Sequence, residues 1–180
     1  MRISYRHLPH IYAIGAPLFI TFRLHNSLPA GRVFPAHLPS GKAFVCMDWL
    51  LDEERAGPTY LRIPAVARLV TNAIRSGVPS DYQVHAWVVM PNHVHVLLTF
   101  RTDPSAALRQ LKGASAREAN QVLGLTGQRF WQEESYDRLV RSPEEFERIE
   151  RYILRNPVKA GLARSPEAYR WSSVFEPRAG

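Results

Sequence analysis

The sequence contains one cysteine, Cys46, among its 180 residues. A lone thiol cannot close a disulfide within the chain, and it cannot supply the clustered thiolates of a structural zinc framework. We therefore expect a fold that needs no oxidising compartment, and the cytoplasm is the expected location.

No apolar run is long enough to cross a membrane. The longest run, residues 11–22, is interrupted by Gly15 and Pro17, whereas a spanning helix needs roughly 20 predominantly apolar residues. Arg2 and Arg6 precede this run, but no small-residue cleavage site follows it. We expect neither a signal peptide nor a membrane partner.

Lysine is also scarce. Of the 23 basic residues, only Lys42, Lys112 and Lys159 are lysines, and the rest are arginines. The net charge of +7 and the pI of about 10.0 indicate a polyanionic partner, because basic surfaces release counterions from nucleic acid. Arginine suits forked contacts with phosphate, although a base composition that favours Arg codons explains the bias equally well.

The hydrophobic periodicity predicts an α+β fold. The expected elements are a strand at 18–24, a helix from Pro64 to Gly77, two strands at 82–90 and 93–100 that form a hairpin, a helix at 103–124 that buries Leu108, Leu111, Ala114, Ala119 and Val122, and an extended piece at 136–140. This β-α-β-β-α-β order is that of a ferredoxin-like sandwich with an antiparallel sheet.

A C-terminal helix is appended to this unit. Ser142 can cap it, Pro143 suits its first position, and two acidic residues follow. The predicted helix buries a stripe that includes Phe146, Ile149, Tyr152 and Ile153. It is expected to end near Asn156, because Pro157 disfavours helical geometry in the residue before it.

One domain, 1–180, is expected, because this length and a hydrophobic content of 46% suit a single core. Residues 26–60 form a long excursion that contains Pro and Gly and shows only a short helix-like patch at 48–54. They are either a structured excursion or a mobile arm. Residues 164–180 form a C-terminal tail.

The run Trp-Val-Val-Met-Pro-Asn-His-Val-His-Val-Leu-Leu, residues 87–98, carries a pair of histidines. Side chains of a strand alternate between its faces, so His93 and His95 project from one side and the valines between and after them from the other. Two adjacent imidazoles suit a metal ion. The alternative is a pair of partly exposed histidines bonded to solvent.

A second element lies far downstream. Tyr152 and Asn156 are four residues apart in the predicted helix and share one face, so that they could complete a site with the histidines. Each has an ordinary alternative: Tyr152 as one more buried aromatic, and Asn156 as a helix terminator. Tyr136 is a rival nucleophile.

Four motifs, in this order, resemble those of a known family. They are Trp-Val-Val-Met-Pro-Asn-His-Val-His at 87–95, Phe-Trp-Gln-Glu-Glu-Ser-Tyr-Asp-Arg at 130–138, Tyr-Ile-Leu-Arg-Asn-Pro-Val-Lys-Ala-Gly-Leu at 152–162, and Trp-Ser-Ser at 171–173. The chain resembles the REP-associated tyrosine transposases, a branch of the single-tyrosine HUH transposases, from about Leu18 to Ser173.

The resemblance implies that His93 and His95 hold Mg²⁺ or Mn²⁺, that Asn156 helps to ligate it, and that Tyr152 is the nucleophile. The implied reaction is nicking and strand transfer of single-stranded DNA through a 5′-phosphotyrosine, at hairpins of palindromic repeats, in DNA transposition. No convincing general base for the tyrosine is evident in the sequence.

The DNA-binding candidates are Arg151, Arg155 and Lys159 beside the predicted tyrosine, and Trp171 for base stacking. The arginines are alternatively a solvated helix face paired with neighbouring glutamates, and Trp171 alternatively packs the terminus onto the core. A non-catalytic hairpin-binding protein and a phosphodiesterase that uses water are competing functions. The protein is expected to be a monomer or a homodimer.

Overall fold

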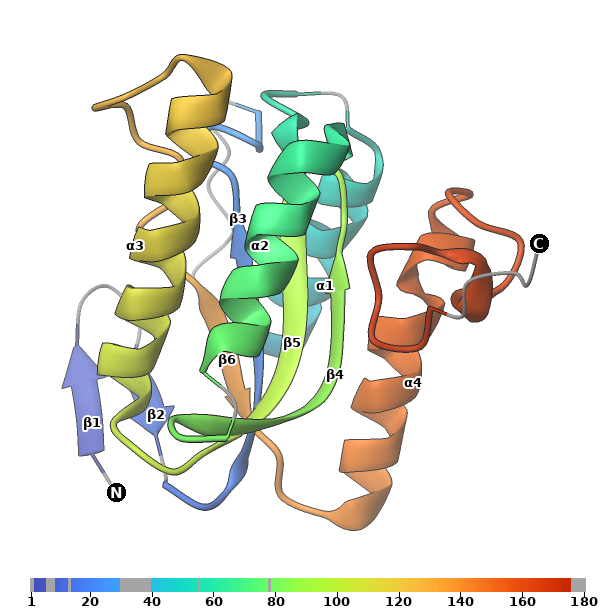
Figure 1. The fold of residues 1–180 in the computed structure, drawn as a ribbon. Helices are drawn as coiled ribbons and strands as arrows, with labels where there is room; N and C mark the ends of the chain where they lie inside the picture. Colours follow the sequence, from blue (N-terminus) through green and yellow to red (C-terminus); the bar gives the residue numbers. More distant parts are fainter. Residues whose placement is uncertain are drawn as a thin grey trace.

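A four-stranded antiparallel sheet lies at the centre of the molecule (Figure 1). The structure, a computed structural model, describes residues 2–5, 9–12, 14–29, 40–54, 56–77 and 79–175. The sheet contains β3 (Pro17–Arg23), β4 (Tyr82–Val89), β5 (His93–Phe100) and β6 (Tyr136–Leu139), in the order β4-β5-β3-β6. The helices are α1 (Ser40–Asp52), α2 (Pro64–Ser76), α3 (Pro104–Leu123) and α4 (Pro143–Lys159), with short 3-10 turns η1 (Tyr60–Arg62) and η2 (Pro166–Ala168). A separate hairpin pairs β1 (Arg2–Tyr5) with β2 (Pro9–Tyr12).

This topology confirms the predicted fold class. Apart from α1 and η1, which lie between β3 and α2, the chain runs β3-α2-β4-β5-α3-β6. Strand β5 lies between β3 and β4 and is antiparallel to both. The tyrosine-bearing helix α4 follows β6. Among the described residues, no helix combines the length and the apolar character needed to cross a bilayer.

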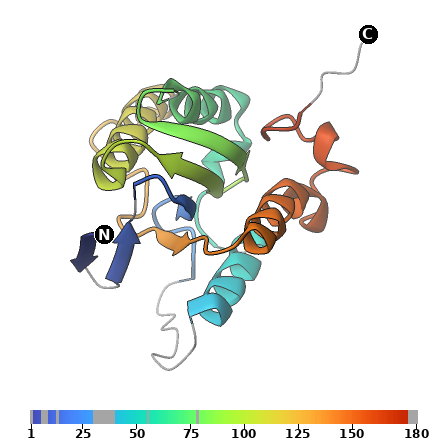
Figure 2. The same ribbon diagram turned by 90° about the horizontal axis from the view of Figure 1, so that it is seen from below.

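Helices cover both faces of the sheet (Figure 2). The helices α2 and α3 lie on one face, and α1 and α4 lie side by side on the other. Along β5, Val94, Val96 and Leu98 belong to the apolar core beneath α2 and α3, while Leu97 belongs to the second core, beneath α1 and α4. The predicted alternation of this strand is therefore confirmed, and both of its faces are buried.

Helix α3 differs from the prediction at two positions, because Ala114 is only partly buried and Val122 is exposed. Asp103 caps its start by accepting from the amide of Ser105, and Gly124 ends it at a φ of 68°. Val122, expected on the buried side, is 54% exposed. Three residues after the fully buried Ala119, it is turned by about 60° from that residue's direction, which carries it off the buried stripe.

Helix α4 continues beyond its expected end. Ser142 caps its start by accepting from the amide of Glu145, as predicted, but the helix reaches Lys159 with Pro157 inside it. The residue before a proline is biased against helical geometry and not barred from it. Here Pro157 lies within the last turn of the helix, where the amide of Ala160 still donates to the carbonyl of Asn156 at 2.9 Å.

The excursion at 26–60 contains more helix than the sequence indicated. Its helix α1 starts at Ser40, well before the predicted patch at 48–54, while residues 30–39 lie outside the described part. Asn92, in the turn between β4 and β5, donates from its side-chain amide to the carbonyl of Leu51 at 2.9 Å. This hydrogen bond ties α1 to the hairpin that carries the histidines.

The two ends of the excursion meet at Gly57. This residue has a φ of 75°, and a Cβ placed there would collide with the backbone of Asn26 and Ser27. We expect Gly57→Ala to lower the free energy of unfolding by about 1–3 kcal/mol, measured by urea denaturation, because it combines backbone strain with this collision.

The matched control is Gly124→Ala. Its φ of 68° is similar, but a Cβ there would meet nothing within 4 Å. Gly124→Ala therefore measures only the effect of backbone strain, and we expect it to lower the free energy of unfolding by less than Gly57→Ala does. Equal losses of unfolding free energy in the two variants would contradict the close approach of Gly57 to the backbone of Asn26 and Ser27.

Candidate metal and nucleophile site

The two histidines of β5 point into the interior on the face covered by α1 and α4. His93 and His95 are both 0% exposed, so the reading of two solvent-bonded histidines is wrong. Their Nε2 atoms lie 3.0 Å apart.

The other ring nitrogens have polar partners that fix the rings. The Nδ1 atom of His93 lies 2.7 Å from Oδ1 of Asn92, and the Nδ1 atom of His95 lies 2.7 Å from the hydroxyl of Thr21 on β3. Such a partner on one nitrogen orients the ring and leaves the other nitrogen for a ligand. Both Nε2 atoms are thus directed toward one point.

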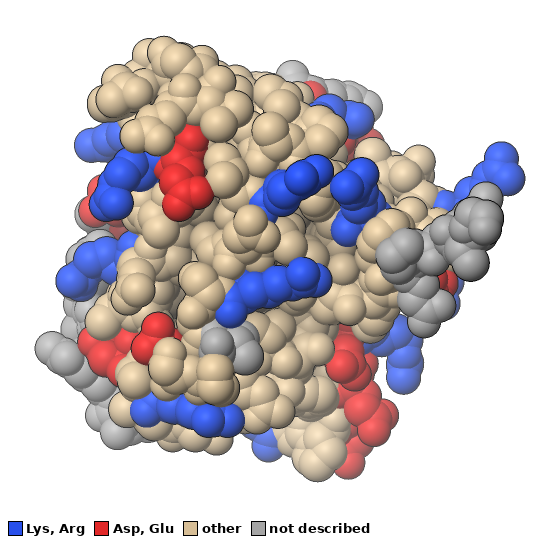
Figure 3. Space-filling view, viewed as in Figure 1, with Lys and Arg blue, Asp and Glu red and all other residues tan. Residues whose placement is uncertain are grey.

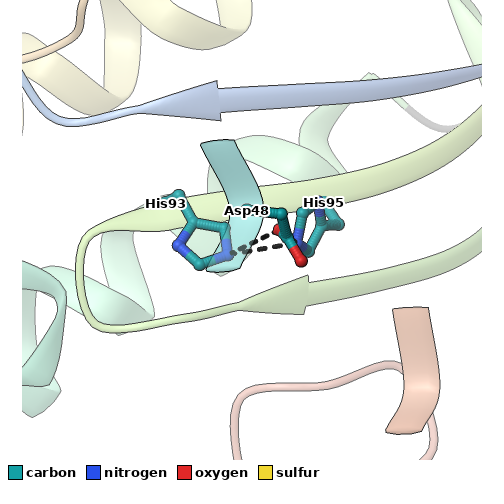
Figure 4. A group of neighbouring side chains, drawn as sticks. All are labelled: Asp48, His93 and His95. Atoms are coloured by element: carbon teal, nitrogen blue, oxygen red, sulfur yellow. Dashed lines mark hydrogen bonds and ion pairs between the residues drawn. The ribbon is translucent and has the colours of Figure 1, made fainter. Parts of the chain in front are cut away.

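A third polar group, which sequence reasoning missed, faces the histidines. Asp48 of α1 is 1% exposed, and its Oδ1 lies 3.1 Å from Nε2 of His95 and 3.7 Å from Nε2 of His93. Figure 4 shows the carboxylate and the two rings directed toward one another. A signal was present, because Phe44 and Leu51 place Asp48 on an apolar helical stripe where a carboxylate needs a partner.

The donor set of Asp48, His93 and His95 fits a divalent cation. Their ligand atoms all lie within 4.8 Å of one another. Oδ1 of Asp48 and Oδ1 of Asn156 are buried without a hydrogen-bond partner. A cation would therefore satisfy groups that the protein leaves unpaired.

Burial and mutual charge set the protonation of the cluster. Burial, followed by repulsion from His95, lowers the pKa of His93 to about 3, so its ring is neutral at physiological pH. Burial acts to raise the pKa of Asp48, but attraction from His95 and from His93 outweighs burial and holds this pKa well below its usual range. A neutral imidazole and an ionised carboxylate are the forms that bind metals.

Tyr152 reaches this cluster from α4. Its hydroxyl donates a hydrogen bond to Oδ2 of Asp48, and its ring packs edge-on against Phe19 and Phe44. Burial and the adjacent Asp48 carboxylate raise its pKa far above the ordinary value, so the hydroxyl is neutral. The tyrosine is partly exposed, which leaves it accessible from outside.

Asn156, one turn later, also reaches the histidines. It is 1% exposed, and its side-chain nitrogen lies 3.1 Å from Nε2 of His95. The structure thus brings together the two predicted ligands, the predicted third ligand and the predicted nucleophile. The rival Tyr136 lies on β6, where its ring stacks on Phe44 with centroids 4.3 Å apart.

The predicted DNA contacts differ in their surroundings. Arg151 and Arg155 are exposed, and they help to line a pocket of about 380 Å³ on the α4 surface beside Tyr152. Lys159, in contrast, is paired with α1, with its ammonium group 2.9 Å from a carboxylate oxygen of Asp52 and 3.4 Å from one of Asp48. Its ammonium group is therefore paired with carboxylates of the same chain, although the side chain is exposed.

Trp171 packs partly buried against the core beneath α2 and α3, and its carbonyl accepts from the amide of Val89 on β4. This placement favours the packing role over base stacking. On the face shown in Figure 3, basic side chains are scattered over α2 and α3, and acidic ones gather over the first half of α4, which contains Glu144, Glu145 and Glu147.

Comparison with known proteins defines the class. The family model described as "Transposase IS200 like" matches residues 71–156, a segment that runs from α2 into α4 and contains both histidines, Tyr152 and Asn156. This segment is similar to the IS200-like transposases, in line with the resemblance that the motifs of the chain predicted. No curated protein matches the chain.

The fold has a solved counterpart. A structure described as a REP-associated tyrosine transposase bound to a REP hairpin aligns over 98% of this chain and 96% of its own length, with 20% identity and a TM-score of 0.59. This likeness shows a shared fold. A protein of Deinococcus radiodurans R1 aligns over 87% of this chain and 98% of its own length, with 17% identity. Its TM-score of 0.37 is too low to indicate a shared fold.

The burial of His93 predicts a dependence of stability on pH. Its folded pKa of about 3 lies below the ordinary 6.5, so the unfolded chain binds the extra proton and stability falls as the pH drops from about 6.5 toward 3. With a chelator present, we expect His93 to lower the free energy of unfolding by about 2 kcal/mol between pH 7 and pH 5. Urea denaturation of His93→Gln should show a shallower pH dependence, and an unchanged one would contradict the assignment.

Proposed function

We propose that this protein nicks single-stranded DNA and transfers the strand through a 5′-phosphotyrosine on Tyr152, with a divalent metal ion held by His93 and His95 and assisted by Asn156. Palindromic hairpins are the proposed substrate. One observation carries the proposal: the hydroxyl of Tyr152 shares a carboxylate, that of Asp48, with both imidazoles.

The chemistry follows from these groups. The phenolic oxygen of Tyr152 attacks the scissile phosphorus, the bond to the 3′ oxygen breaks, the phenol loses its proton, and the 3′ oxygen leaves as a hydroxyl. The phosphotyrosine conserves the phosphodiester bond energy, so a second 3′ hydroxyl can reverse the step and join the strands. A bound Mg²⁺ or Mn²⁺ supplies Lewis-acid polarisation and orientation of the phosphate.

The protein environment also explains why the hydroxyl of Tyr152 must be activated before it can attack. The pKa of Tyr152 is raised by burial and by the Asp48 carboxylate, so the neutral hydroxyl is a weak nucleophile. A cation at the histidines would offset the negative charge of Asp48 and so reduce this rise. Nucleophile and metal site therefore work as one unit.

The substrate is inferred from the surface and from the structural relative. Arg151 and Arg155 extend outward from the helix that carries Tyr152 and line its pocket, where they would contact backbone phosphates. The relative of known structure was solved with a REP hairpin, which supports a hairpin substrate for this chain.

Adduct formation tests the nucleophile. Incubation with a labelled single-stranded hairpin and Mn²⁺ is expected to give a covalent protein–DNA species that survives denaturing electrophoresis. Tyr152→Phe lacks the attacking oxygen and should abolish it, whereas Tyr136→Phe, an identical change on β6, should retain it.

Mass spectrometry of the adduct would then assign the linkage and its polarity. Undiminished adduct in Tyr152→Phe would refute the nucleophile. Tight hairpin binding without cleavage in any divalent metal would instead indicate a non-catalytic DNA-binding protein, and released product without an adduct would indicate hydrolysis by water.

Salt dependence tests the phosphate path. In a metal-free Tyr152→Phe background, Arg155→Ala should weaken hairpin binding and reduce the slope of log affinity against log salt by about 1, because one phosphate contact is lost. Arg117→Ala, at another exposed arginine on α3, should leave the slope unchanged. An identical slope in both variants would remove Arg155 from the DNA path.

A further inference from the structure

We propose that Asp48 couples the metal ion to the nucleophile: its Oδ1 is a third protein ligand, and its Oδ2 positions the hydroxyl of Tyr152. This inference rests on the proposed function. It gives the excursion at 26–60 a role in the site, because Asp48 is supplied by α1.

The first half of the inference concerns Oδ1. This oxygen is buried without a hydrogen-bond partner and faces Nε2 of both histidines at 3.1 and 3.7 Å. An ionised carboxylate in such a place is costly unless it is paired. Lys159 contacts the other oxygen, Oδ2, and a cation between the three groups would pair with Oδ1.

The second half concerns Oδ2. This oxygen accepts the hydrogen bond of Tyr152 and lies 3.4 Å from the ammonium group of Lys159. The ring of Tyr152 is held edge-on by Phe19 and Phe44, so ring and hydroxyl are both restrained. The two oxygens of one rigid carboxylate thereby fix the distance from nucleophile to metal, and such fixed geometry accelerates a reaction by removing motional freedom.

The position of α1 supports this coupling. Its Leu51 carbonyl accepts from the side chain of Asn92, and Oδ1 of Asn92 lies against the ring of His93. Lys159 joins α4 to Asp48 and Asp52. The helix that bears Asp48 is thus fastened both to the hairpin of the histidines and to the helix of the tyrosine.

Metal binding without DNA tests the ligand role. Calorimetric titration with Mn²⁺ is expected to show that Asp48→Asn binds at least about 10-fold more weakly than the unmodified protein. Glu147→Gln is the control, because it removes one negative charge from an exposed carboxylate on α4. Its Mn²⁺ affinity should be unchanged. Equal Mn²⁺ affinity in Asp48→Asn and the unmodified protein would overturn the ligand role.

The rate of adduct formation at saturating Mn²⁺ tests the positioning role. A residue that served only as a ligand would regain the full rate once Mn²⁺ is saturating, whereas Asp48→Asn is expected to remain slower by about 10-fold or more. Full recovery would overturn the positioning role. Should Asp48→Asn fail to show a cooperative thermal transition, Asp48→Glu replaces it: this variant keeps the charge but lengthens the side chain, so Mn²⁺ binding should persist while the rate falls.

The outcomes separate this inference from the proposed function. Loss of Mn²⁺ affinity in Asp48→Asn, with no adduct formed even by the unmodified protein, would support the ligand role and refute strand transfer. An adduct that forms equally fast in Asp48→Asn, with unchanged Mn²⁺ affinity, would refute the coupling and leave strand transfer intact. No Mn²⁺ binding by the unmodified protein would refute the ligand role together with the metal site.

Discussion

The alternation of side chains along β5 is the constraint on which the site depends. With both faces of this strand covered, one face takes valine and leucine into the core, and the other holds His93 and His95 away from water. Imidazoles buried in this way lose solvent as a hydrogen-bond partner, so the protein must satisfy them. Asn92 and Thr21 do so at one nitrogen of each ring, and the remaining nitrogens are left for a ligand.

The burial of Asp48 completes the electrostatic arrangement. A carboxylate that is 1% exposed needs positive partners, and it finds Lys159 and the polar edges of the two imidazoles. The same group raises the pKa of Tyr152. In the proposed reaction, one buried negative charge therefore both attracts the cation and restrains the nucleophile until the cation is bound.

Much of this was accessible from sequence because it is local. The strand period placed both histidines on one face, the spacing of four placed Tyr152 and Asn156 on one helix face, and Ser142 marked the start of α4. Two local predictions failed. Pro157 lies inside α4, although the helix was expected to end before it. Val122 is exposed, although it was expected on the buried side of α3. Lys159 carries the expected charge, yet it is paired within the protein, because spacing along one helix does not reveal what a second helix places opposite it.

The sequence by itself determined the β-α-β-β-α-β order, the shared direction of the two histidines and the resemblance to a transposase family, since periodicity and motifs are properties of neighbouring residues. Only the tertiary structure decided that Asp48 joins the site, that it accepts from Tyr152 and not from Tyr136, and that α1 packs beside α4. These contacts join residues about a hundred positions apart. Such pairings follow from how buried faces and buried charges are satisfied together, and no local pattern encodes them.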